Sequence, residues 1–115
     1  MNTPTEQQPR SLEEAEAIVD IFESLEKLES NPDFKKVFEK HLFTDEVIRL
    51  HSLLAHPEKS IVDSRDRILS DLDALSNVKF ALLMIRSIGK SVKTQLEEFR
   101  AAEFEESLEA NGEEL

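Results

Sequence analysis

One segment of the 115-residue chain, residues 75–99, reads LSNVKFALLMIRSIGKSVKTQLEEF and repeats its apolar positions at alternating steps of three and four. The stripe that this spacing defines, which we call the seam, consists of Leu75, Val78, Leu82, Ile85, Gly89, Val92, Leu96 and Phe99. On an α-helix these positions share one narrow face, as in a coiled coil, so the seam predicts a helix that packs against another helix. We expect the seam residues to be contact residues, not catalysts.

The helix that carries the seam is expected to be long. No proline occurs between Ser60 and Phe104, and Gly89 is the one glycine in that range. A single helix of roughly 45 residues, about 67 Å long at 1.5 Å per residue, is therefore predicted. A glycine inside a helix costs about 1 kcal/mol relative to alanine, so a break at Gly89 is the main structural alternative. On the seam, however, a missing side chain lets another backbone or a phenylalanine ring approach closely, and we expect continuity.

A first, shorter helix is expected from Leu12 to about Glu29. Ser11 and Glu14 form a capping box, in which the serine hydroxyl and the glutamate carboxylate each accept a hydrogen bond from a backbone N–H group at the helix start. Apolar residues then recur on one side of the helix, and glutamate dominates the other faces. The inner side is predicted to consist of Ala15, Ile18, Phe22, Leu25 and Leu28, with Val19 and Ile21 widening it.

Two further short helices are expected between residues 32 and 54. Asn31 is a good N-cap, and Pro32 at the first helical position lacks only an N–H group that has no helical partner there. This pair predicts a second helix to about Leu42. Thr44 is a candidate N-cap for a third helix to about Leu54.

Together these elements predict an all-α fold, a helical hairpin or bundle in which short N-terminal helices pack on one long C-terminal helix. The composition agrees, because the chain has only 2 glycines and 4 prolines and neither tyrosine nor tryptophan. We expect residues 1–10 to be a disordered tail, residues 11–104 to be a single helical domain, and residues 105–115 to be an acidic tail in which the helix frays. A cluster of Phe22, Phe34 and Phe38 should hold the shorter helices down.

The charge of the chain restricts its partners. With 25 acidic and 14 basic residues, the formal net charge is −11, which opposes nonspecific attachment to nucleic acid or to an anionic membrane. We therefore expect no direct nucleic-acid partner and no membrane contact. The most apolar run, residues 80–85, is too short to span a bilayer, and the absence of cysteine fits a soluble protein of a reducing compartment.

No motif in the sequence supports catalysis. His41, His51 and His56 lack the i, i+4 spacing of a helical zinc site, and no nucleophile, base and orienting residue can be combined into a specific site. Residues 88–91 superficially resemble a phosphate-binding loop, but the earlier glycine that such a loop requires is replaced by Met84. We expect no enzyme activity, no metal or other cofactor, and no small-molecule substrate.

Basic residues repeat beside the seam. Lys79, Arg86 and Lys93 are spaced by seven, and the first helix presents an acidic row of Glu13, Glu16, Asp20, Glu23 and Glu26. Pairing between the two rows would fix the register of the two helices. An exposed pair contributes less than about 1 kcal/mol, so we assign these charges to register and not to stability.

Three segments carry a resemblance to a known group of proteins: NPDFKKVF at residues 31–38, DEVIRL at residues 45–50 and DLDALS at residues 71–76. Over about residues 11–105 the chain resembles small acidic helical proteins encoded among the structural genes of tailed bacteriophages. That group has no catalytic residues to transfer. The resemblance implies a virion-associated or assembly protein made in a bacterial host, located in the host cytoplasm or in the virion.

The sequence therefore favours a non-enzymatic protein–protein interaction protein that acts through its long helix, as a homo-oligomer or within a larger protein assembly. Virion component, scaffold and assembly chaperone all remain open. The alternative is a soluble acidic inhibitor or nucleic-acid mimic that occupies a basic groove on a host protein.

Overall fold

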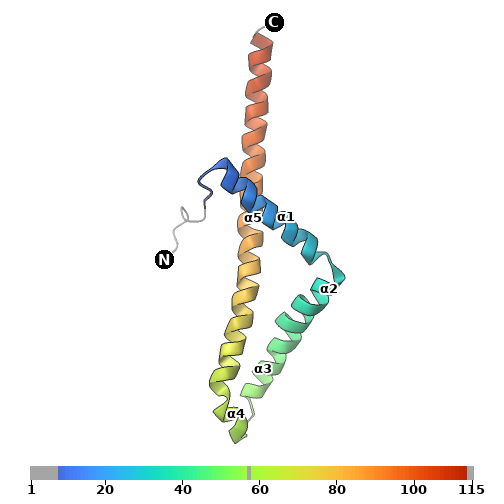
Figure 1. The fold of residues 1–115 in the computed structure, drawn as a ribbon, viewed down its shortest axis with the longest axis vertical. Coiled ribbons are helices and arrows are strands. Elements are labelled where there is room, and N and C mark those ends of the chain that lie inside the picture. Colours follow the sequence, from blue (N-terminus) through green and yellow to red (C-terminus); the bar gives the residue numbers. More distant parts are fainter. Residues whose placement is uncertain (1–7, 57, 114–115) are drawn as a thin grey trace. The chain divides into compact units, whose positions relative to one another are not determined.

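A computed structural model of the chain describes residues 8–56 and 58–113, and in this range all regular structure is helical. The elements are, in chain order, α1 (Leu12–Glu29), α2 (Pro32–Phe34), the π-helix η2 (Lys35–Asp45), α3 (Glu46–Leu54), α4 (Lys59–Asp63) and α5 (Arg65–Glu113) (Figure 1). The all-α class is confirmed, and the long C-terminal helix packs against shorter N-terminal helices. Residues 1–7 of the expected N-terminal tail and residues 114–115 of the expected acidic tail lie outside the described residues.

Helix α1 has the bounds that the sequence predicts. The Ser11 hydroxyl accepts a hydrogen bond from the backbone N–H of Glu14 at 3.1 Å. The Glu14 carboxylate accepts one at 3.2 Å from the backbone N–H of Arg10, the residue before the serine. The serine half of the capping box is therefore present, whereas the Glu14 carboxylate accepts from the residue before the N-cap and not from the N-cap itself.

The cap at Asn31 is also confirmed, because its Oδ1 accepts from the backbone N–H groups of Asp33 at 2.8 Å and Phe34 at 3.4 Å. The expected N-cap at Thr44 is wrong. Its hydroxyl donates to the Glu39 carbonyl at 2.8 Å, and helical backbone continues from η2 directly into α3. No proline or glycine interrupts residues 33–54, so nothing forces the chain to leave the helix between the second and third predicted elements.

The long helix begins at Arg65, later than the expected start near Ser60. Ser64 separates it from α4 with a backbone ψ of 5°, and the Ser64 hydroxyl donates to the Ser60 carbonyl at 2.9 Å. Serine side chains compete with helical hydrogen bonds in this way. Helix α5 then runs through Gly89 without a break, as predicted, and continues past Phe104 to Glu113.

The chain divides into two compact units, residues 1–24 with 85–115, and residues 25–84. In the first unit, the beginning of α1 packs against the second half of α5 through Ala15, Val19, Val92 and Leu96, with Ile18 and Ile88 beside them. In the second unit, α3 and α4 pack against the first part of α5 around Leu50, Ile68 and Leu72, with Val47, Leu53, Leu54, Ile61 and Leu75 at the edge. The domain boundaries expected from the sequence stay predictions. Among the described residues, none of the helices combines the length and hydropathy that a membrane crossing requires.

Candidate interaction surface

Gly89 of α5 lies against Phe22 of α1 in the first unit. A Cβ atom built on Gly89 would lie 2.6 Å from Cγ and 3.0 Å from Cδ1 of Phe22, and still closer to the Phe22 Cβ. Phe22 is only 5% exposed. The missing side chain of Gly89 therefore leaves room for a phenylalanine ring, as expected from the position of Gly89 on the seam.

The structure divides the seam into covered and uncovered positions. In the first unit Gly89, Val92 and Leu96 are buried, Ile85 is half-buried and Phe99 is 50% exposed. In the second unit Leu75 packs against the cluster around Leu50, Leu82 is half-buried and Val78 is 47% exposed. Part of the seam is therefore used for contacts within the chain. Contact between the seam and a partner stays a prediction.

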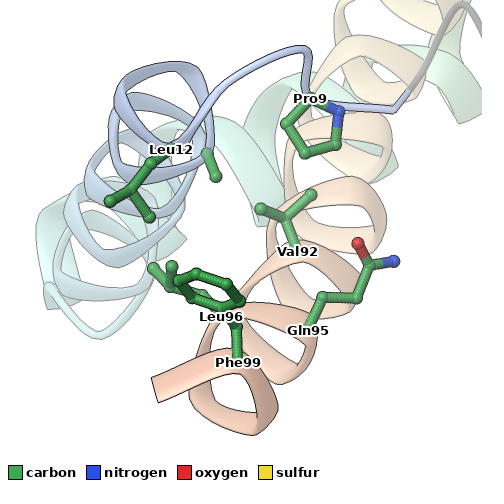
Figure 2. Close-up of a pocket in the computed structure, with 7 residues that line it drawn as sticks. Pro9, Leu12, Val92, Gln95, Leu96 and Phe99 are labelled. Atoms are coloured by element: carbon green, nitrogen blue, oxygen red, sulfur yellow. The ribbon is translucent and has the colours of Figure 1, made fainter. Parts of the chain in front are cut away.

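A groove lies between α1 and α5 where the covered part of the seam ends. It has a volume of about 290 Å³ and is lined by Pro9, Leu12, Ala15, Val92, Gln95, Leu96 and Phe99. Figure 2 shows Leu12 on α1, Val92 on α5 below Pro9, and the Phe99 ring next to Leu96. We call this the α1/α5 groove. Gln95 is the one polar side chain in its lining, so the groove offers apolar contact and very little hydrogen bonding.

An ion pair on the same helix pair joins Glu16 of α1 to Arg100 of α5, with a distance of 3.5 Å between Glu16 Oε1 and Arg100 Nη2. Arg100 is seven residues after Lys93 and so continues the basic row of Lys79, Arg86 and Lys93. The sequence analysis names Glu16 but misses Arg100, although its spacing marks it. Both side chains are at least half exposed, which suits a role in register more than in stability.

The expected aromatic cluster is arranged differently from the prediction. Phe34 and Phe38 stack with their ring centroids 4.7 Å apart, and Phe38 also contacts Phe43 at 6.2 Å with the rings tilted. Phe22 packs on Gly89 in the other unit. Phe43 is missed by the sequence analysis because it was placed between two predicted helices, whereas it lies inside η2.

His41, His51 and His56 are exposed, and in residues 8–56 and 58–113 no three His, Asp or Glu side chains are arranged to hold a metal ion. The hydrogen bond from Arg49 Nε to Glu46 Oε2, 3.0 Å long, lowers the pKa of the Glu46 carboxyl and raises that of the Arg49 guanidinium. Both groups lie on α3, and this pair is a local helix contact.

Large apolar side chains are exposed on α5 outside the groove. Residues 80–85 are the most apolar run of the chain, yet in the structure Phe80 is 61% and Leu83 49% exposed. Phe104 and Leu108, one helical turn apart, are also exposed. The middle of α5 thus presents an apolar surface that the described part of this single chain leaves open.

The chain matches no family model, no curated protein and no solved structure. The candidate surface therefore has to be interpreted from its own geometry and chemistry.

Proposed function

We propose that this chain is a non-enzymatic protein–protein interaction protein that acts through α5, as a homo-oligomer or as part of a larger protein assembly. The observation that carries the proposal is the exposure of Phe80 and Leu83, which are three residues apart on α5 and therefore neighbours on its surface. Single exposed apolar residues are common, but several together mark interaction sites.

The biological setting is proposed from the sequence. The resemblance of residues 31–38, 45–50 and 71–76 to small acidic helical proteins of tailed bacteriophages supports a virion-associated or assembly role, in the host cytoplasm or in the virion. Purification of the tagged protein from phage-infected cells tests this. Capsid, portal or tail proteins among the bound material would support an assembly role, and their absence would count against it.

Self-association tests the interaction role directly. We expect light scattering at several protein concentrations to show a multimer, and we expect Leu83→Asp to weaken it while circular dichroism stays unchanged, because Leu83 is 49% exposed in the single chain. Ala81→Asp introduces the same charge at an exposed position on the opposite side of the helix and is the matched control. A chain that is monomeric at every concentration and captures no assembly protein would refute the proposed function.

The second candidate function is an acidic inhibitor that occupies a basic groove on a host protein. It is favoured by the exposed glutamates near the end of α5, which are Glu97, Glu98, Glu103, Glu105, Glu106 and Glu109. This candidate predicts capture of a basic enzyme in a 1:1 complex that weakens as salt is added. It also predicts that Leu83→Asp has no effect on that complex.

A further inference from the structure

The charges of α5 are separated along its length. Between Asp73 and Glu97 the helix has no acidic residue and four basic ones, Lys79, Arg86, Lys90 and Lys93. From Glu97 to Glu113 it has seven glutamates and a single basic residue, Arg100, and Arg100 is paired with Glu16. One helix therefore has a basic middle followed by an acidic end.

The basic middle also carries exposed apolar side chains. Leu83 is four residues after Lys79 and three after Phe80, so its side chain neighbours both on the surface of α5. All three side chains are exposed, and all three lie in the second unit. Together they form what we call the basic patch, a cationic amphipathic helix surface.

The acidic end carries the complementary features. Continuing the seam beyond Phe99 by steps of four and three reaches Glu103 and Glu106, so the face that lines the α1/α5 groove becomes acidic immediately after it. Both glutamates are exposed, and Phe99 and Leu12 are each 50% exposed in the groove. Arg10 beside Pro9 is the basic residue at the other side of the groove.

We propose that the α1/α5 groove and the acidic face beyond it bind the basic patch of a second copy of this chain. Phe80 or Leu83 of one copy would enter the groove between Leu12 and Phe99 of the other, and Lys79 would face Glu103 and Glu106. The inference rests on the proposed interaction function and names its partner and its contacts. The driving force is apolar burial, and the charges set the orientation.

The groove suits a side chain better than a small ligand. Its volume of about 290 Å³ is at the lower limit of the roughly 300–1,000 Å³ typical of small-molecule sites, which also present several polar groups for orientation. Only Gln95 is polar in the lining. An apolar anchor with a charged flank is the usual form of helix recognition in a groove.

The two surfaces are different parts of the chain, so the contact is heterologous. Each copy offers one groove and one basic patch, and head-to-tail contacts of this kind form rings or open chains, not closed two-fold dimers. The expected mass in light scattering therefore grows with protein concentration.

A charge-swap experiment tests the pairing. A middle variant, Ser76→Glu with Lys79→Glu, makes the basic patch acidic; an end variant, Glu103→Lys with Glu106→Lys, makes the acidic face basic. All four side chains are exposed, so the fold should be kept, which circular dichroism checks. Each variant alone should associate about ten-fold more weakly than the wild type or not at all. A mixture of the two, or one chain carrying all four changes, should associate again.

The matched control is Glu98→Lys with Glu105→Lys, which reverses the same number of charges as the end variant at exposed positions on another face of α5 and should leave association unchanged. If the wild type associates but the swapped mixture does not recover, the pairing is refuted while the interaction function stands. If association survives both single variants, a different surface joins the copies. If the wild type is monomeric throughout and captures no assembly protein, the proposed function fails as well.

Discussion

At Gly89 the space available is smaller than one methyl group. A Cβ on this residue would overlap the first atoms of the Phe22 side chain, which cannot move away without shifting the α1 backbone. We predict that Gly89→Ala destabilises the chain by up to about 2 kcal/mol. Overpacking costs about 1–3 kcal/mol, and the better helix propensity of alanine returns about 1 kcal/mol of it. Urea unfolding followed by circular dichroism measures the change.

Gly112 provides the control for this substitution. It lies on the same helix with no atom within 4 Å of a built Cβ. Gly112→Ala should therefore leave the free energy of unfolding unchanged or raise it slightly. Equal stability changes for both alanine variants would show that helix propensity alone decides, and that Phe22 does not pack as described.

The ion pair on α3 gives a prediction about pH. The Arg49 hydrogen bond lowers the pKa of Glu46, so the pair contributes stability above the ordinary carboxyl pKa and loses it as the pH falls through the lowered folded value. We expect the pKa of Glu46 to lie below the ordinary glutamate value in a carboxyl NMR titration. Arg49→Gln should return the pKa of the Glu46 carboxyl to the ordinary range. An unchanged pKa in the variant would assign the shift to another cause.

At the scale of elements, the two candidate caps behave differently. Asn31 accepts two backbone N–H groups at the start of α2, so Asn31→Ala should cost about 1 kcal/mol, and Asn31→Asp should retain most of that stability. Thr44 donates to a carbonyl inside a continuous helix, so Thr44→Ala should be neutral or stabilising, since alanine is the better helix former. Urea unfolding of the three variants measures these changes in the free energy of unfolding. A loss of about 1 kcal/mol in Thr44→Ala would show that Thr44 acts as an N-cap after all.

The success of the sequence analysis also differs between elements. The bounds of α1 and the continuity of α5 at Gly89 follow from local signals, a capping box and an uninterrupted apolar period. Local signals do not predict that the second and third expected helices join. Threonine is compatible with both an N-cap and a helix interior, and Thr44 takes the interior position because its hydroxyl donates to the Glu39 carbonyl. The break at Ser64 is equally hard to predict from the sequence, because serine is common both inside helices and at their ends.

The candidate surface was only partly predictable, because a sequence pattern shows which residues share a helix face but not which of them a neighbouring helix covers. The seam marks which residues share a face, but periodicity does not say where α1 stops covering that face. Burial therefore ends between Leu96 and Phe99 without any change in the pattern. The groove depends on Leu12 and Pro9, which are distant in sequence from the seam and carry no motif of their own.

At the scale of the whole molecule, stability is expected to be distributed over two cores that share no residue. Leu96→Ala should increase amide hydrogen exchange mainly in residues 85–113 and the start of α1. Leu50→Ala should increase it mainly in residues 46–84. Each substitution removes buried contacts worth about 2–5 kcal/mol, and local opening follows cooperative units. An equal increase in both regions for either variant would show that the chain unfolds as one unit.

The net charge of −11 makes salt act in opposite directions on folding and on association. Within one chain the excess of carboxylates is repulsive, so screening should stabilise the folded state. A gain of about 1 kcal/mol would raise Tm by about 4–8 °C for a domain of this size.

Between copies the proposed contact joins opposite charges, so the same salt should weaken it. We therefore predict that Tm at low protein concentration rises with sodium chloride while the mass measured by light scattering falls. A Tm that falls with salt would mean that ion pairs such as Glu16–Arg100 outweigh the repulsion. A mass that rises with salt would mean that apolar contact alone joins the copies, and that the basic middle and acidic end of α5 do not recognise each other.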